Sequence, residues 1–309
     1  MNYKLLIILG WISIAIGACS TSSTAPAEIK ENITEVIKEE PPKSLLWEIT
    51  GNGLTDASYL FGTIHMIDAE DYFLPEGTLT AIDQSSKMVF ELNMEEVMDP
   101  ANMMGVMQKA FMKGDTSLSD LLTTEEYGVV EAHFKEKGLP LFMFERMRPM
   151  FLTIFATDLD PTGLQSGGLK SYEMEFTEMA KEGDKATGGL ETIDYQISVF
   201  DAIPYRDQAL MLVEAITSSS DSDSFADLVN LYKEQDIYGL YEMMKTDDSI
   251  GDFEDVLLFQ RNKNWIPLME EEMKVQRTFF AVGAGHLGGD LGVISLLRKA
   301  GYNVRPVSS

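Results

Sequence analysis

The sequence predicts a mixed α/β (α+β) fold, in which a central mixed sheet is built from the N- and C-terminal segments and the middle region is largely helical. Two observations support this prediction. Apolar runs rich in β-branched and aromatic residues lie towards both ends of the folded part, at 45–65 and 277–307. Between them, charged amphipathic stretches with helix start and stop signals dominate the chain.

Length and composition are typical of a protein with a substantial core. The chain has 309 residues, 45% hydrophobic content and a formal net charge of −26, and this hydrophobic content is normal for a globular protein. The negative charge repels phosphate groups, so nucleic acid is excluded as a partner. We interpret the acidity as a means of keeping the surface soluble.

The N-terminus has the pattern of a bacterial lipoprotein signal. Lys4 precedes the apolar run 5–18, which is too short to span a bilayer comfortably, and the run ends in "IGAC". This ending resembles a lipobox, so we predict a signal peptide over residues 1–18 and lipidation of Cys19, the only cysteine. The expected location is the periplasmic face of a membrane, the outer membrane being favoured because Ser20 carries no inner-membrane signal. A plain signal anchor is the alternative.

A polar segment separates this signal from the folded part. Residues 19–44 are rich in Ser, Thr, Glu and Lys, lack aromatic residues and contain a Pro-Pro pair. Such a segment cannot bury enough apolar surface to fold alone. We therefore predict a disordered tether over 19–44 and one folded domain over 45–309.

The elements of the folded domain follow in order. "LLWEI" and "SYLFGTIH" flank a Gly-containing turn and predict a hairpin, and "KMVFEL" at 87–92 predicts a further strand. Helices are expected at 79–85, from the capping pattern of "TTEEYGVVEAHF", after Pro149, over "SYEMEFTEMAKEG", through about 194–247 and over 253–275. "KATGGLET" is a short strand or loop, and the chain ends with a strand, the loop "AGHLGGD", a helix and a strand.

Two histidines stand in the same unusual context. An apolar strand enters Gly-x-x-His at Gly62–His65 and again at Gly283–His286, and these are two of only three histidines in the chain. A side chain just past a strand is fixed yet faces a crevice, and the nearby Gly62, Gly283 and Gly285 leave room for close approach. We expect few core contacts for a histidine in such a glycine-rich crevice.

An acidic residue and a cation complete the candidate site. Glu91 lies near the end of an apolar strand, where a carboxylate needs a partner. Two histidines and a glutamate form a familiar catalytic metal set, so His65, Glu91 and His286 are candidate ligands. Arg261 follows an apolar run and either holds an oxyanion or pairs with Glu91.

Other patterns have ordinary structural interpretations. His133 lies on a charged helix and is expected to be a solvated surface group. The Met-rich stretch 94–112 is typical of helix core, with an adaptable peptide-binding groove as the alternative. No complete nucleotide-binding loop is present.

The chain resembles the TraB/PrgY/GumN family, which includes the TIKI metalloproteases. The resemblance covers about 45–307 and is carried by "YLFGTIHMID", "LPEGTLTAIDQSSKMVFEL", "GGLETIDYQISVFDAIPYRDQ", "RNKNW" and "AVGAGHLGGDLGVISLLRKAGYNV". It places the family's two histidines, glutamate and Arg-Asn pair at His65, His286, Glu91, Arg261 and Asn262. Relatives often have an aspartate where "GGLKSY" has Lys170, a departure that puts retained catalysis in doubt.

The resemblance implies metal-dependent hydrolysis of peptide or protein substrates with a divalent ion such as Mn, Co or Zn. Under this interpretation Glu91 is a ligand or the general base, Arg261 stabilises the oxyanion, and Asn262 orients the arginine or the substrate. Two alternatives remain. One is a non-catalytic protein that sequesters a peptide, and the other is a metal-free hydrolase that uses a histidine base.

Overall fold

The computed structural model describes residues 42–155, 166–219, 223–245 and 253–307, which belong to a unit spanning Pro41–Ser309. The predicted signal peptide, Cys19 and the tether up to residue 41 lie outside the described residues. Within the described ranges, no helix is both long and apolar enough to span a membrane.

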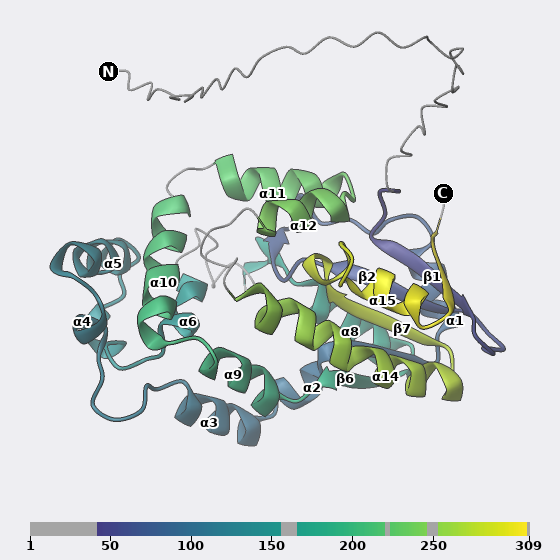
Figure 1. Cartoon of the computed structure of the whole chain (residues 1–309), viewed down its shortest axis with the longest axis horizontal. Coiled ribbons are helices and arrows are strands. Elements are labelled where there is room, and N and C mark those ends of the chain that lie inside the picture. The colour runs from purple at the N-terminus through teal and green to yellow at the C-terminus, as the bar shows by residue number, and fades with distance from the viewer. Residues whose placement is uncertain (1–41, 156–165, 220–222, 246–252, 308–309) are drawn as a thin grey trace, which may run out of the picture. The chain divides into compact units, whose positions relative to one another are not determined.

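Six strands form the main sheet, and they come from both ends of the folded chain. In Figure 1 the purple strands of the N-terminal part lie beside the yellow strands of the C-terminal part, and the order is β6-β4-β7-β2-β1-β8. The strands are β1 (Leu46–Gly51), β2 (Ser58–Thr63), β4 (Lys87–Leu92), β6 (Ala186–Glu191), β7 (Thr278–Gly283) and β8 (Tyr302–Pro306). The predicted mixed sheet is thus confirmed, and "KATGGLET" provides one of its strands.

The directions of the strands determine at which edge of the sheet functional side chains can lie close together. β1 pairs antiparallel with both β2 and β8, as expected for the predicted hairpin. In contrast, β2 is parallel to β7, β7 to β4, and β4 to β6. The carboxyl ends of these four strands therefore share one edge, the edge at which open α/β sheets usually bind ligands.

Helices cover the sheet and extend away from it. The α-helices are α1 (Thr78–Gln84), α2 (Met94–Val97), α3 (Pro100–Lys109), α4 (Leu118–Leu121), α5 (Thr124–Glu136), α6 (Pro149–Leu152), α8 (Tyr172–Glu182), α9 (Ile193–Asp201), α10 (Tyr205–Ser219), α11 (Asp223–Lys233), α12 (Ile237–Lys245), α14 (Gln260–Val275) and α15 (Val293–Lys299). A π-helical segment, η3 (Asp255–Phe259), precedes α14, and short 3₁₀ turns form η1 (Leu141–Met143), η2 (Thr153–Phe155) and η4 (Ala284–His286). A small antiparallel pair joins β3 (Ile67–Asp68) to β5 (Leu169–Lys170).

Aromatic packing holds α8 against the sheet. The ring of Phe176 lies 5.1 Å from that of Phe61 in β2 and 5.4 Å from that of Phe279 in β7, both edge to face. Edge-to-face contacts at this spacing add to the free energy gained from burial alone. Because α8 is fixed in this way, its first turn lies beside the end of β2.

The helical middle region has a hydrophobic cluster of its own. Its buried members come mainly from α4, α5, α6 and α10, and they are Leu118, Leu122, Val130, Phe134, Leu141, Leu152, Ala209, Leu212 and Ile216. The predicted capping box at the start of α5 is present, between Thr123 and Glu126. This region therefore folds on its own apolar contacts and not only on those with the sheet.

Two sequence interpretations are wrong in this region. Helix α3 has no buried residue, and Met98, Met103, Met104 and Met107 of the Met-rich stretch are each more than half exposed. That part of the stretch is therefore not helix core. His133 is half-buried rather than solvated, since its Nε2 lies 2.8 Å from the carbonyl oxygen of Phe155.

Candidate active site

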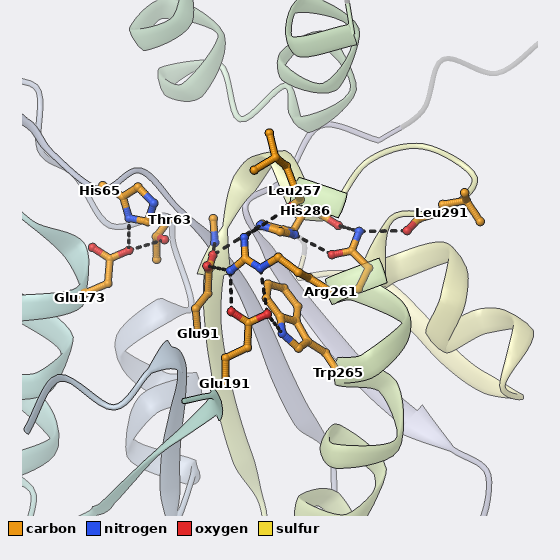
Figure 2. A network of polar contacts seen from close by, with 12 residues as sticks. Thr63, His65, Glu91, Glu173, Glu191, Leu257, Arg261, Trp265, His286 and Leu291 are labelled. Atoms are coloured by element: carbon orange, nitrogen blue, oxygen red, sulfur yellow. Dashed lines mark hydrogen bonds and ion pairs between the residues drawn. The ribbon is translucent and has the colours of Figure 1, made fainter. Parts of the chain in front are cut away.

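The candidate residues gather at the shared carboxyl edge of the parallel strands. A cavity of about 420 Å³ lies there, and its lining includes Thr63, His65, Glu91, Arg261, Gly283, Gly285 and His286. The histidines come from loops after β2 and β7, and Glu91 comes from the end of β4. Asn262 and Gly62 lie outside the lining of this cavity. Figure 2 shows Glu91 between His65 on one side and His286 on the other.

His286 is buried and firmly oriented. Its Nδ1 lies 2.6 Å from Oδ1 of Asn262, and its Nε2 lies 3.2 Å from Nη1 of Arg261. Arginine can only donate, so Nε2 is the acceptor and Nδ1 carries the proton. Burial lowers the pKa of His286 to about 4, outweighing the attraction of Glu91. The imidazole is therefore neutral at pH 7.

The expectation that His286 makes few core contacts is wrong. Only 6% of the residue is exposed, and its ring lies 4.5 Å from the ring of Trp265 in α14. The neighbouring glycines did not signal this burial, because the contacts come from the preceding helix, α14, which packs back against the end of β7.

Glu91 is ionised in spite of its burial. Burial by itself would raise the pKa of this carboxyl group, but His286, Arg261, His65 and the backbone N–H of Gly283 together lower it to about 2. The closest of these contacts are an ion pair of 2.6 Å with Arg261 and a hydrogen bond of 2.8 Å from Gly283. Oε1 of Glu91 lies 3.8 Å from Nε2 of His286.

Arg261 is held by a second carboxylate that sequence reasoning missed. Glu191, the last residue of β6, accepts from Nε of Arg261 at 2.8 Å and from Nη2 at 2.9 Å (Figure 2). The indole of Trp265 also donates to Glu191, at 2.9 Å. Glu191 ends a strand just as Glu91 nearly does, and this shared position was the available signal.

Every donor of Arg261 is engaged. Besides the two glutamates, Nη1 faces the carbonyl oxygen of Leu257 at 3.2 Å and Nε2 of His286 at 3.2 Å. These contacts account for all five N–H groups of a guanidinium. The predicted pair with Glu91 is present, but as the residues stand here no N–H of Arg261 is left for an oxyanion.

Asn262 orients a histidine rather than the arginine or a substrate. It is 1% exposed, and its amide nitrogen donates to the carbonyl oxygens of Leu291 at 3.0 Å and His286 at 3.4 Å. With its oxygen bound to the imidazole of His286, both ends of the amide are used inside the protein. The role predicted for Asn262 is thus corrected.

His65 occupies the open side of the cavity. Its side chain is 75% exposed, and its Nδ1 lies 3.2 Å from Oε1 of Glu173, which also accepts from the hydroxyl of Thr63 at 2.7 Å. The hydrogen bond to Glu173 raises the pKa of His65 to about 9, because it outweighs the loss of hydration within the cavity wall. In Figure 2, His65, Thr63 and Glu173 lie on the other side of Glu91 from Arg261 and its partners.

Glu173, and not the residue at position 170, is the acidic partner of His65 in this structure. Lys170 itself pairs with Glu175 at 2.8 Å and lies over the ring of Tyr72. Glu173, in the first turn of α8, is instead the acid beside His65. An acidic group is therefore present beside His65, although Lys170 stands where relatives often have an aspartate.

The loop glycines allow close packing of protein groups. A Cβ on Gly62 would lie 3.1 Å from Ala284, one on Gly283 would lie 3.2 Å from Oε1 of Glu91, and one on Gly285 would lie 2.4 Å from Sδ of Met244. Side chains at these positions would push the two histidine loops and their neighbours apart. Small residues are needed at these positions, as predicted, but the groups that approach them closely belong to the protein itself.

The donor set suits a divalent metal, although the side chains are not drawn together around one point. In the described part of the chain, no three His, Cys, Asp or Glu side chains are grouped so that they could hold a metal ion. Both histidines nevertheless have Nδ1 anchored on an oxygen, by Asn262 and by Glu173, as metal-binding histidines usually do. His65, cationic in this structure at neutral pH, must release a proton to act as a ligand.

Charge favours a cation at the same place. One guanidinium, that of Arg261, faces the two carboxylates of Glu91 and Glu191, and all three side chains are at most 11% exposed. A buried excess of negative charge is costly unless a further cation neutralises it, a role that protonated His65 partly fills in this structure.

A family model matches almost the whole described unit. The model of the TraB/PrgY/gumN family matches residues 45–306. The chain belongs to this family.

Several relatives are named metalloproteases. Metalloprotease TIKI1 of Danio rerio is 23% identical over 314 residues, which cover 84% of this chain and 62% of the relative. TIKI1 of Homo sapiens is 23% identical, covering 91% of this chain and 64% of the relative, and TIKI2 of Xenopus tropicalis is 22% identical, covering 86% and 60%. The chain thus spans 60–64% of the length of these relatives. No solved structure matches the chain.

Proposed function

We propose that the protein is a metal-dependent hydrolase that acts on peptide bonds. The observation that carries the proposal is the pairing of an ionised, buried Glu91 with a neutral His286 whose Nδ1 is fixed by Asn262. The metalloprotease names of the relatives support the reaction class.

In this proposal His65 and His286 hold the ion, and Glu91 is the third ligand or the general base. When bound, a divalent ion supplies Lewis acidity, which polarises a carbonyl group and activates water near neutral pH. Asn262 and Glu173 keep the two imidazoles in position. Glu91, already ionised, accepts a proton without first having to lose one.

Arg261 gains a role in this scheme through His286. At present one Nη1–H of Arg261 faces the Nε2 lone pair of that histidine. If Nε2 of His286 held the ion, this N–H of Arg261 would lose its acceptor and could serve an oxyanion in the cavity. Glu191 keeps the guanidinium in place throughout, since it binds Nε and Nη2.

The shape of the site supports an extended substrate. A second cavity of about 220 Å³ shares His65, Glu91 and Gln196 with the first and continues past Met94 and Val97 of α2. Two adjoining cavities with the candidate residues between them allow a chain to lie on both sides of the reacting bond. This arrangement favours a peptide over a compact small molecule.

Metal content and hydrolysis, measured side by side, test the proposal. Purified protein is loaded with Zn, Mn or Co, and its metal is quantified by mass spectrometry while a mixture of peptides is followed for cleavage. We expect about one ion per chain and cleavage that stops with a chelator. His65→Ala should lose both, with little change in melting temperature because its side chain is exposed. His133→Ala, in which the third histidine is removed, should lose neither.

Other outcomes support the two alternatives. Cleavage that continues in metal-free protein would support a hydrolase with a histidine base. Peptide binding without cleavage, in protein that takes up no metal, would support a sequestering protein. Either result would contradict the metal-dependent hydrolase.

We also propose that the protein is a lipoprotein anchored through Cys19 on the periplasmic face of a membrane, with the outer membrane favoured. The basis is the apolar run 5–18 and its "IGAC" ending. Cells are labelled with a palmitate analogue, and we expect label on the wild type and none on Cys19→Ala. Equal labelling and equal membrane association of the two proteins would contradict the proposal.

A further inference from the structure

One side of the main cavity is apolar, although the candidate catalytic groups are polar. Side chains that form this apolar side include Val199, Phe200, Leu240, Met244, Leu257 and Leu258, contributed by α9, α12 and η3. The same cavity has Glu91, Arg261 and His286 in its wall. None of these three groups needs an apolar neighbourhood of this extent for its hydrogen bonds.

We propose that this apolar side is a specificity pocket that takes one large apolar side chain of the peptide, next to the bond that is cleaved. The inference rests on the proposed peptide hydrolase, because that function places the peptide backbone at Glu91 and His286. The inference adds to that function the kind of residue that the enzyme prefers next to the cleaved bond.

The polar groups nearest to the pocket offer little to a polar side chain. The hydroxyl of Thr63 already donates to Glu173 at 2.7 Å, and that of Tyr232 donates to the carbonyl oxygen of Gly62 at 3.0 Å. Gln196 also lines the cavity, but a charged or amide side chain placed against Leu240 and Leu257 would lose hydration and gain few hydrogen bonds, which is costly. An apolar side chain has no such cost and gains free energy from burial.

The volume suits one side chain with its adjoining backbone. At about 420 Å³ the cavity lies near the lower end of the range of roughly 300–1,000 Å³ found for small-ligand sites. It is too small for a folded partner and large enough for an aromatic or branched aliphatic residue.

Met244 is the wall residue that connects the pocket to the catalytic loop. Its Sδ lies 2.4 Å from the position that a Cβ would take on Gly285, the residue before His286. Methionine is flexible and polarisable, so this wall can adapt to side chains of different shape. Met244 is thus the residue at which a single change should alter specificity while the candidate ligands remain in place.

A series of blocked peptides that differ in one residue tests the pocket in the wild-type, metal-loaded protein. The varied residue is Phe, Leu, Ala, Ser, Asp or Lys, and kcat/KM and Kd are measured for each peptide. We expect Phe and Leu to exceed Ser and Asp by on the order of 10- to 100-fold. Equal values for all six peptides would overturn the inference, and this test needs no variant to fold.

A charge in the wall should change the preference. Met244→Glu places a carboxylate in the pocket, so the Phe-to-Lys ratio of kcat/KM should fall by on the order of 10-fold or more. The matched control is Met104→Glu on α3, where the methionine is 67% exposed and outside the cavity lining, and its ratio should equal that of the wild type. A folded Met244→Glu protein with an unchanged ratio would overturn the assignment of this wall.

The measurements separate this inference from the proposed function. If no peptide is cleaved but the Phe and Leu peptides bind more tightly, the hydrolase proposal fails and the pocket remains. If all peptides are cleaved equally, the hydrolase remains and the pocket fails. If a fatty acid bound in the cavity and none of the six peptides displaced it, the choice of an amino-acid side chain as the occupant would be overturned.

Discussion

Arg261 contacts two carboxylates, an imidazole and a carbonyl oxygen within one buried cluster. A planar guanidinium meets this demand because it has five donors in fixed directions, whereas an ammonium group has only three. The residue therefore holds together the ends of β4 and β6 and the start of α14. The contacts that place Arg261 at the candidate site therefore also stabilise the fold.

Replacing Arg261 should be costly. In Arg261→Met the carboxylates of Glu91 and Glu191 lose their cation while remaining buried, so we expect a loss of about 3–5 kcal/mol of unfolding free energy. Denaturant unfolding measures this loss. The control is Arg206→Met, because Arg206 makes a similar two-bond pair with Glu126 but is 40% exposed, and its loss should be much smaller. Similar costs for the two variants would contradict the assignment.

The charge of His65 should depend on Glu173. In Glu173→Gln the hydrogen-bonding shape is nearly kept but the negative charge is gone, so the pKa of His65 should fall from about 9 towards its ordinary value of 6.5. NMR titration of metal-free protein measures it, and a chain with three histidines gives a spectrum simple enough to assign. A pKa of His65 that does not move would show that Glu173 is not its partner in solution.

Among the elements, the segment from η3 to α14 differs most from its expected form. A single helix was predicted over 253–275, whereas Asp255–Phe259 is π-helical and α14 begins at Gln260. π-Helical turns within helices occur frequently at functional sites. Here the carbonyl oxygen of Leu257 lies in that turn and accepts from Arg261, so the altered helix contributes directly to holding the guanidinium.

Helix α5 belongs to the hydrophobic cluster of the helical middle region, and its histidine is not part of the candidate site. We predicted that His133→Ala leaves activity unchanged, and this prediction stands because His133 is absent from both cavities described at the candidate site. The histidine does bond the carbonyl oxygen of Phe155, so we now expect a loss of about 1 kcal/mol of unfolding free energy. Peptide cleavage and thermal unfolding are the two measurements. A large fall in turnover with the fold intact would contradict this view.

At the scale of the whole molecule, the chain carries a net charge of −26. Most ion pairs on the surface are partly exposed and contribute little each. The buried cluster is different, because the pKa of Glu91 and that of His286 are both well below their ordinary values. The dependence of stability on pH should therefore reflect a few buried residues, superimposed on the general repulsion between surface carboxylates.

Acid should remove the contribution of this cluster. Glu91 has a pKa of about 2 in the folded protein and 4.5 ordinarily, so its stabilisation is complete above pH 4.5 and lost as the pH falls towards 2. His286, at about 4 against 6.5, behaves in the same direction between pH 6.5 and 4. His65, at about 9 against 6.5, behaves oppositely and loses its smaller, solvent-screened contribution as the pH rises from 6.5 through 9.

Melting temperatures of the wild type and Glu91→Gln, measured with a chelator at steps from pH 8 to 2, test this view. The wild type should be more stable at neutral pH by an amount on the order of a few kcal/mol. The difference should shrink below pH 4.5 and vanish near pH 2. A difference that stays constant with pH would show that the ionisation of Glu91 does not stabilise the fold.

The sequence by itself determined the fold class and much of the site. Periodic apolar runs and Gly-containing turns predicted the hairpin and the strand Lys87–Leu92, because these features act locally along the chain. Two Gly-x-x-His patterns predicted His65 and His286, and both line the same cavity. These residues follow or end strands, and strand ends can be recognised without knowledge of which strands are neighbours.

Only the tertiary structure decided how these residues are paired. Glu91 meets Arg261 across 170 positions of sequence, and Glu191 meets the same arginine across 70. Local patterns carry no information about such distances, because the pairing depends on β4 lying between β6 and β7 in parallel. The burial of His286 and the assignment of Glu173 to His65 depend in the same way on where α14 and α8 pack against the sheet.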